Sequence, residues 1–481
     1  MHDWKRADVP SWAGRPFVSG SMEAGKRISG RDIVTENRPP LWQDRAAHLA
    51  LIFFLALIYI TPGSLSPLLE GVPIAKGVAV LSSFFLLWAK GSRGEKWRIF
   101  DKTSFWLIVF VAIEGFSILT ALWKVYALTV FLNALKLVWI YFLIINLVDS
   151  VRRVRSAFWT LVLAAMAPAA GALIRYLSKT DLVEGYRAAW VGVFADPNDL
   201  AYHLIVLIPI LLALLETEPS PRLKGVLLIA LAVFIAAIYV TFSRGGLIGL
   251  TVILFFRAWR SKNRMMNISA GALILIALLG WAPSGYRERA ETILKFRQDE
   301  SAMGRIYAWR AGVSMALDRP VLGVGVGCFV LGWPIYAPPE AGTKWRAAHN
   351  TFVEVLGENG ILGFIAFFAF IATALRGAQK VRPERFDPIP LLLRKSWNRS
   401  PLSYGEAGKR GTKKGLDQME RLERYARGLE IALWGFLACG VTLGVSRSWA
   451  PYLFVALIVS LRRIWMERTF GKPDLILKGG T

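Results

Sequence analysis

The stretch GVLLIALAVFIAAIYVTFSRGGLIGLTVILFF, residues 225–256, carries one charged side chain, Arg244, in 32 residues. A membrane crossing takes about 20 predominantly apolar residues, so this length predicts two successive membrane helices. The turn between them would lie at Ser243-Arg244-Gly245-Gly246. Similar apolar runs recur along the whole chain, and they decide the fold class.

The 481 residues are 54% hydrophobic and include 19 Trp and 28 Phe, and the mean hydropathy is +0.43. A soluble protein of this length would not carry so many runs of spanning length. We therefore predict an all-α polytopic membrane protein with about twelve transmembrane helices and one long external loop that carries short helices. The predicted spans are 46–62, 73–90, 104–123, 126–148, 157–176, 199–216, 223–242, 246–259, 267–284, 350–375, 428–445 and 449–462.

The cations alternate along the connections between these spans. The N-terminal stretch has eight Lys/Arg, the next connection, 63–72, has none, and every second connection after it is again rich in cations. By the positive-inside rule both termini are cytoplasmic, and the net charge of +24 reflects topology rather than nucleic-acid binding. The predicted parts are a cytoplasmic tail 1–45, helices one to nine over 46–284, a large periplasmic loop 285–349, helix ten at 350–375, a cytoplasmic loop 376–427, helices eleven and twelve over 428–462, and a cytoplasmic tail 463–481.

Two further features bound the function. Cys328 and Cys439 are too few for a disulfide framework or a thiolate metal site. The first apolar run follows a long polar stretch, which does not fit a cleavable signal peptide, so it is expected to stay as the first membrane helix. In loop 376–427 we expect mostly irregular structure and then a surface helix leading into span eleven.

The external side holds the candidate polar residues. Asp196-Pro197-Asn198-Asp199 opens span six, where Asp196 suits an N-cap and Pro197 the first helical position. Asp199 and His203 are four residues apart and share a helix face, which favours a structural pair over a catalytic one.

Arg244 is a stronger candidate for binding. An external Arg in a very short turn runs against the charge bias, and its guanidinium suits phosphate oxygens. Gly245 and Gly246 would make the turn and let a phosphate approach the backbone. The alternative is that Arg244 only reaches the lipid head groups.

The long external loop contains two further segments. Met303–Arg310 resembles a short amphipathic helix with Trp309 at the membrane interface, and it carries Arg305. Arg319 precedes Gly323, Gly325 and Gly327, whose spacing is not a dinucleotide fingerprint. A turn packed closely against membrane helices is the expectation for these glycines.

A third polar segment begins at Arg346 and includes His349 and Asn350. Asn350 suits a helix cap, while Glu354 and Glu358 are four apart and face the same way. Ionisable groups in a membrane segment usually mark a site. Histidine, with an ordinary pKa near 6.5, is a natural general base for an alcohol.

The order of these polar segments along the chain resembles that of the O-antigen ligase/polymerase family. The segments are Phe194–Ala201, Ser243-Arg244-Gly245, Gly304-Arg305 with Trp309, Arg319-Pro320 with two of the glycines, and His349-Asn350 with Glu358-Asn359-Gly360. The resemblance covers roughly residues 190–365 and implies a GT-C-like helical fold in the inner membrane of bacteria, with the site on the periplasmic side. Loop 376–427 and the N-terminal tail have no counterpart in this pattern.

The resemblance implies en bloc transfer of a glycan from undecaprenyl diphosphate to a hydroxyl, without nucleotide sugar, metal or other cofactor. Arg244 and Arg305 would hold the diphosphate and His349 would activate the acceptor in a single, inverting displacement. Supporting positions would be Asp196, Asn198, Asp199, Arg319, Arg346, Asn350, Glu354 and Glu358. No acidic pair or His/Cys spacing typical of a metal site was found.

The acceptor stays open between lipid A–core, a growing polysaccharide and a protein side chain. A protein O-glycosylation ligase of the same family is therefore an alternative. A lipid-linked glycan flippase, from another class, would also need cations. A transporter is expected to show paired halves and broken helices, and since no internal repeat is visible, the sequence favours an enzyme.

Overall fold

The computed structural model describes residues 42–99, 101–260, 300–381 and 406–470, with a few positions between 263 and 273. Within these ranges there is no β-strand, only an isolated bridge between Val183 and Arg187. Nine of the described helices are long and apolar enough to cross a membrane. The predicted class, an all-α polytopic membrane protein, is therefore confirmed. The predicted N-terminal tail up to residue 41, most of span 267–284, and residues 285–299, 382–405 and 471–481 lie outside the described residues.

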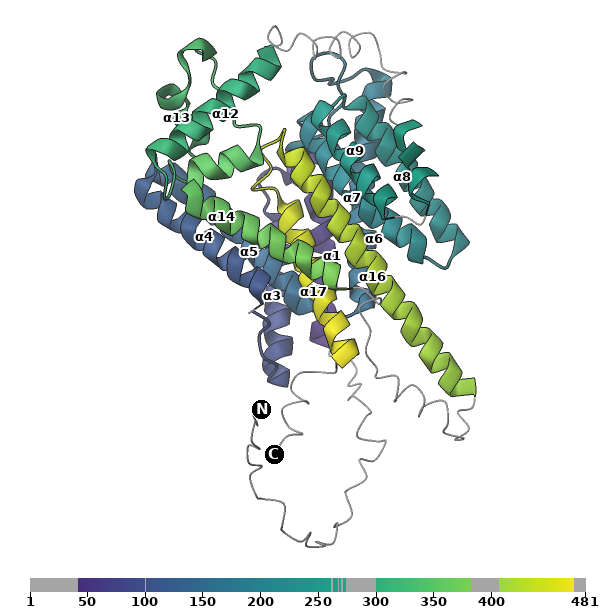
Figure 1. Cartoon of the computed structure of the whole chain (residues 1–481). Helices are drawn as coiled ribbons and strands as arrows, with labels where there is room; N and C mark the ends of the chain where they lie inside the picture. Colours follow the sequence, from purple (N-terminus) through teal and green to yellow (C-terminus); the bar gives the residue numbers. More distant parts are fainter. Residues whose placement is uncertain are drawn as a thin grey trace, which may run out of the picture. The chain divides into compact units, whose positions relative to one another are not determined.

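The helices follow one another as Figure 1 labels them. In the first half they are α1 (Trp42–Ile60), α2 (Pro62–Leu65), η1 (Pro67–Leu69), α3 (Ile74–Arg93), α4 (Lys102–Thr120), α5 (Lys124–Leu147), α6 (Val151–Ser178), η2 (Gly192–Phe194), α7 (Pro197–Thr217), α8 (Pro221–Val240) and α9 (Arg244–Trp259). In the second half they are α12 (Glu300–Asp318), α13 (Phe329–Tyr336), η4 (Pro339–Ala341), α14 (Thr351–Lys380), α16 (Glu406–Gly440) and α17 (Trp449–Phe470).

Side-chain caps set where several of these helices begin. Asp101, Ser150, Ser220 and Ser243 each accept a hydrogen bond from a backbone N–H in the first turn of α4, α6, α8 and α9. These bonds satisfy donors that a membrane helix leaves open at its N-terminus. The helices α4, α8 and α9 begin two residues before the predicted spans, at 102, 221 and 244, and α6 begins at 151, six residues before its predicted span.

The long helix α16 departs from prediction in extent. The polar stretch of the predicted cytoplasmic loop and most of predicted span eleven form one continuous helix of 35 residues, Glu406–Gly440. Because that helix begins at 406, less of loop 376–427 is irregular than expected. In Figure 1 α16 runs alongside α7, against which it packs.

Helix α7 lies at the centre of one group of helices. It is buried on all sides, from Leu200 to Leu211, by contacts with α6, α8, α9 and α16. A helix that is apolar all round is expected in such a position. In the rest of the bundle α1 packs on α3 and α6, α4 on α14, and α5 on α17.

Ion pairs between helix ends join connections that the charge alternation predicts to lie on the same side of the membrane. At one end Arg153 pairs with Asp44 at 2.5 Å and Arg155 with Glu218 at 2.5 Å. At the other end the Ser448 hydroxyl lies 3.2 Å from Nε2 of His203. All four residues of the two ion pairs come from connections predicted to be cytoplasmic. Which end faces the cytoplasm stays a prediction.

Helix α14 is broken at Gly360, although the sequence predicted one uninterrupted helix here. Gly360 has φ 63° and ψ −166°, and the Ile361 N–H donates to the Pro320 carbonyl at 2.8 Å. The freed carbonyls of Gly357 and Glu358 accept from the N–H groups of Val324 and Gly325, both at 2.9 Å. Broken backbone at membrane depth is tolerated where protein satisfies it.

Steric contacts explain why glycines occupy the turn at residues 323–327. Gly323, Gly325 and Gly327 all have positive φ. A Cβ on Gly323 would collide with the backbone of Glu358, and one on Gly325 with Ala121. The predicted turn packed tightly against membrane helices is therefore confirmed.

Candidate active site

Asn198 joins the beginnings of α7 and α9. Its Oδ1 accepts from the Ser243 hydroxyl at 2.8 Å and from Nη2 of Arg187 at 2.9 Å. Its backbone N–H donates to Oδ1 of Asp196 at 2.6 Å, which confirms Asp196 as the N-cap of α7. Arg244, half-buried, is the first residue of α9. The start of α9 is therefore fixed relative to α7 by hydrogen bonds.

Gly245 and Gly246 have a different role from the predicted one. Both are helical residues of α9, and the turn before them is made at Phe242, which has φ 50°. A Cβ on Gly245 would collide with the Thr442 hydroxyl, and one on Gly246 would lie 3.0 Å from Cβ of Ala201. The side of Gly245 that a Cβ would occupy is filled by the connection after α16, and that of Gly246 by α7, so close packing explains both glycines.

His349 stands at the beginning of α14 in an uncommon conformation. Its φ is 44°, and such left-handed backbone away from glycine costs about 1–3 kcal/mol unless the surroundings impose it. The next residue, Asn350, caps α14 by accepting from the N–H groups of Phe352 at 2.9 Å and Val353 at 3.1 Å. Asn350 is thus confirmed as a cap, and its bonds hold His349 just outside the helix.

Cations surround the imidazole of His349. Part of the residue is open to solvent, yet the burial that the protein imposes on the imidazole lowers its pKa below the usual 6.5. The nearby Arg305 cation lowers the pKa further, with a smaller contribution from Arg346, while Asp196 and Glu354 act in the opposite direction. The net effect keeps His349 neutral at neutral pH, which is the form that accepts a proton.

Helix α12 brings Arg305 to this place. It packs along α14, where Gly312 leaves room for Val353. In the first half of α12, the guanidinium of Arg346 rests on Gly304, where any Cβ would collide with it. Arg346 therefore lies against α12 at Gly304, the chain neighbour of Arg305, and both cations are close enough to His349 to act on its imidazole.

A residue that the sequence analysis did not select organises the two glutamates. Nη1 of Arg447 donates to Oε2 of Glu358 at 2.6 Å, and Nη2 lies 3.3 Å from Oε1 of Glu354. The Glu358 carboxylate also accepts from the N–H groups of Gly327 at 2.9 Å and Phe329 at 3.2 Å. Glu354 and Glu358 share one face as predicted, and that face meets Arg447.

This arrangement decides what the two carboxylates can do. Glu358 is 2% exposed in its side chain and has both oxygens occupied by donors. Oε2 of Glu354 accepts from the Ser446 hydroxyl at 2.7 Å. Both side chains therefore tie α14 to the connection between α16 and α17, and they are poor candidates for a base. The sequence contained a signal that could have indicated Arg447, because Arg447, like Arg244, is an arginine in a short connection predicted to be external.

His203 and Asp199 form the structural pair that was favoured, though not through the carboxylate. Nδ1 of His203 lies 2.8 Å from the Asp199 backbone carbonyl, and Nε2 lies 3.2 Å from the Ser448 hydroxyl. The imidazole is buried and packs 4.8 Å, between ring centroids, from Trp449. Both ring nitrogens are engaged, so His203 joins α7 to α17.

Two other positions in the external loop support the fold. Arg319 donates to the Thr120 carbonyl at the end of α4 and lies 3.6 Å from Oδ2 of Asp318. Trp309, expected to anchor at the membrane interface, packs half-buried in a cluster with Trp333 and Ala341. Helix α12 is also longer than the short helix expected, at 19 residues.

The comparisons with known proteins address this same region. Residues 229–368 match the family described as O-antigen ligase, a segment that contains Arg244, Arg305 and His349 and ends before Arg447. The chain is also similar to the exopolysaccharide production protein ExoQ of Rhizobium meliloti (strain 1021), with 32% identity over 109 residues. That alignment covers 20% of this chain and 24% of the length of ExoQ. These two similarities support the resemblance to the O-antigen ligase/polymerase family that the sequence motifs indicated.

Proposed function

We propose that the chain is a membrane glycosyltransferase that moves a glycan en bloc from undecaprenyl diphosphate to an acceptor hydroxyl. One observation carries this: His349 lies among Arg305 and Arg346 in the segment that matches the O-antigen ligase family. A neutral imidazole beside guanidinium cations suits a reaction that takes a proton from an alcohol while an anionic group leaves.

Arg244 and Arg305 bind the diphosphate of the donor. A guanidinium offers two parallel N–H groups to phosphate oxygens and stays charged at any physiological pH. Asn198 and Ser243 fix the start of α9, and with it the backbone of Arg244, by a 2.8 Å hydrogen bond. Arg346 adds positive potential beside Arg305. As the bridging oxygen takes up charge in the transition state, both guanidiniums neutralise it.

The chemical step is one displacement at the anomeric carbon. The acceptor O–H bond breaks as its proton passes to a ring nitrogen of His349, and the oxygen forms a new bond to the anomeric carbon. The bond from that carbon to the phosphate oxygen breaks on the opposite face, and the undecaprenyl diphosphate leaves with the electron pair. The configuration at the anomeric carbon inverts. Charge neutralisation comes from arginine in this scheme, so it needs neither a metal ion nor a nucleotide.

The same groups serve a growing polysaccharide, lipid A–core or a protein side chain, because each acceptor presents only a hydroxyl to His349. The test is transfer by the purified chain in liposomes, with undecaprenyl-diphosphate glycan and each acceptor in turn, scored as release of the lipid diphosphate. Acceptor-dependent release supports the proposal. Movement of the glycan lipid across the bilayer without release would favour a flippase.

The site lies on the periplasmic side of the inner membrane, with both termini in the cytoplasm. The exposed Glu340, next to α13, and Glu420, on α16, allow a direct test, because both native cysteines are buried and give little background. In intact cells a membrane-impermeant maleimide is expected to label Glu340→Cys and not Glu420→Cys. The reverse pattern would reject the placement of the site.

A further inference from the structure

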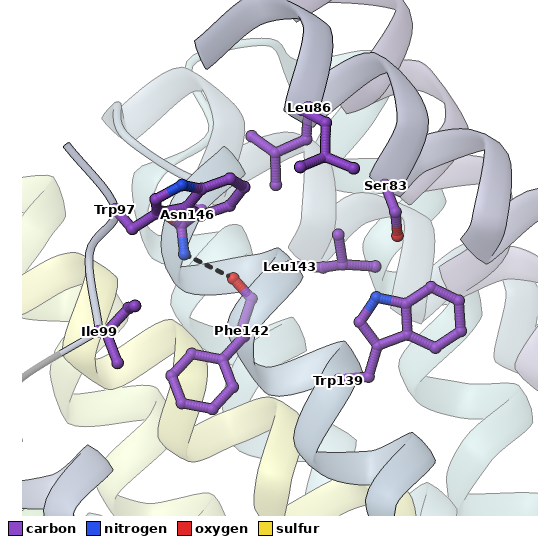
Figure 2. Close-up of a pocket in the computed structure, with 9 residues that line it drawn as sticks. Ser83, Leu86, Trp97, Ile99, Trp139, Phe142, Leu143 and Asn146 are labelled. Atoms are coloured by element: carbon purple, nitrogen blue, oxygen red, sulfur yellow. Dashed lines mark hydrogen bonds between the residues drawn. The ribbon is translucent and has the colours of Figure 1, made fainter. Parts of the chain in front are cut away.

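A cavity of about 290 Å³ lies between α3, α5 and residues 97–99. None of its lining residues belongs to the candidate active site. Figure 2 shows the rings of Trp97 and Trp139 across from each other, with Leu86 and Leu143 between them. Its remaining lining residues are Ser83, Leu87, Ile99, Phe142 and Asn146. All the lining residues except Ser83 and Asn146 are apolar or aromatic, and Leu87 and Trp97 are exposed at the rim of the cavity.

Hydrogen bonds hold the walls of this cavity in place. Oδ1 of Asn146 accepts from the Arg98 N–H at 3.1 Å, and its Nδ2 donates to the Arg98 carbonyl at 3.2 Å. The same Nδ2 donates to the Phe142 carbonyl at 2.9 Å (Figure 2). The Lys90 ammonium donates to the Lys96 carbonyl at 3.1 Å and lies 5.5 Å from the Trp97 ring centroid. Segment 96–98 is thereby fastened over α3 and α5.

Cations gather beside the fastened segment. Arg98 lies close enough to both Lys90 and Arg463 to act on them electrostatically. Lys90 has Glu95 at 3.9 Å and Arg463 has Glu467 at 3.8 Å, whereas within the described ranges no carboxylate forms an ion pair with Arg98. Asp44 also acts on Lys90, and Asp149 on Arg463, so carboxylates offset these two cations. Arg98 is the cation that stands next to the apolar cavity, at the helix ends that the charge alternation predicts to be cytoplasmic.

We propose that this cavity binds one acyl chain of an anionic phospholipid, with the lipid phosphate at Arg98. The volume holds about ten groups of the size of a water molecule, which suits a single chain of methylenes and is too small for a helix. Basic pockets between membrane helices on the cytoplasmic side match anionic head groups, because the phosphate meets cations while the chain stays in the hydrocarbon region.

The test uses the full chain in phosphatidylcholine nanodiscs with a phosphatidylglycerol that carries a photoreactive diazirine on its acyl chain. After irradiation, cross-linked peptides are located by mass spectrometry. We expect the cross-links to concentrate on the peptides of α3 and α5 that line the cavity. A phosphatidylcholine carrying the same diazirine should label them several-fold less.

Two variants separate the chain from the head group. Ser83→Phe places a ring in the cavity, and Arg98→Gln removes the cation, so each should lower the labelling several-fold. The matched controls are Leu81→Phe, at an exposed position of α3 outside the cavity, and Arg376→Gln, at an exposed position in the last turns of α14.

Equal labelling by the two lipids, or variants that label like wild type, would overturn the proposal. A cavity that loses labelling only in Ser83→Phe would overturn the anionic part of it. Size-exclusion profiles of the four variants identify any that fails to fold. The readout needs no glycan transfer, so it stands or falls independently of the proposed activity.

Discussion

The beginnings of α7 and α14 look alike in sequence and differ in use. Each has an Asx cap, Asp196 or Asn350, and each has a histidine close by. In α7 the histidine is His203, inside the helix, with both ring nitrogens engaged by Asp199 and Ser448. In α14 it is His349, just outside the helix, partly open to solvent and close to Arg305.

The difference shows how a membrane protein separates a structural imidazole from a reactive one. An imidazole with a partner on each nitrogen can neither take nor give a proton without breaking a buried hydrogen bond. His349 lies at a backbone position that costs free energy, and the same position keeps it out of the helix. Such a cost is typical of functional sites.

The largest expected effect follows from removing each histidine in turn. General-base catalysis contributes about 10²- to 10⁴-fold, so His349→Asn should lower the rate of transfer by that factor and leave binding of the donor lipid nearly intact. Asn tolerates positive φ, so the backbone cost does not rise. The measurement is release of lipid diphosphate beside a donor-binding assay.

His203→Gln is the counterpart, and it should lower stability by about 1–3 kcal/mol through lost buried hydrogen bonds while the folded protein keeps most of its transfer. His48→Gln serves as a control for the loss of a structural histidine elsewhere, because His48 in α1 forms a hydrogen bond with Ser156 in α6. If His349→Asn transfers glycan at the wild-type rate, the contrast between the two helix beginnings is structural only.

A second contrast concerns what holds each helix beginning. Removing one partner of a fully buried ion pair costs about 3–5 kcal/mol. The Arg447 side chain is 26% exposed, so Arg447→Met should destabilise the fold by the lower end of that range, because the Glu358 carboxyl is left buried without its cation. Asn198→Ala at α7 should cost about 1.5–3 kcal/mol, since the Arg187 guanidinium and the Ser243 hydroxyl both lose their acceptor. Thermal unfolding in detergent gives both values. Adding Glu354→Gln and Glu358→Gln to Arg447→Met should recover part of the loss, and an absence of recovery would contradict the ion-pair explanation.

The sequence predicted the parts of this site that depend on local chemistry. Asp196 and Asn350 cap helices because their side chains reach the next N–H groups along the chain, and the 323–327 glycines sit in a tight turn, as their spacing indicated. The pairing of Arg447 with Glu358 links residues 89 positions apart, and no local pattern encodes it. The contact of Gly245 with Thr442 is also long-range, because one sequence does not distinguish a glycine that makes a turn from a glycine that leaves room for a distant segment.

A smaller effect is expected from changing geometry while keeping charge at Arg244. Lysine keeps the cation but not the fork, and losing one hydrogen bond to a charged group costs about 1.5–3 kcal/mol, so Arg244→Lys should lower transfer roughly 10- to 100-fold. Arg222→Lys is the matched control, because Arg222 is also in the first turn of a helix, α8, and is exposed. Near-full activity of Arg244→Lys would reduce Arg244 to a point charge.

The smallest effect is a shift in the pH profile, and it tests whether His349 and Arg305 act on each other. The pKa of His349 lies below 6.5, first through burial and then through Arg305. Only the neutral imidazole accepts a proton, so kcat/KM should decline on the acid side with an apparent pKa below 6.5. Arg305→Gln removes a cation that lowers the pKa, so the residual activity should decline at a higher pH than in wild type. Arg310→Gln, which removes an exposed Arg of the same helix paired with Glu340 at 3.7 Å, should leave the profile unmoved. The profile of kcat/KM reports the pKa of groups in the free enzyme. If the acid limb of that profile stays in place in Arg305→Gln, Arg305 does not influence the pKa of His349, and only its role in binding the diphosphate remains.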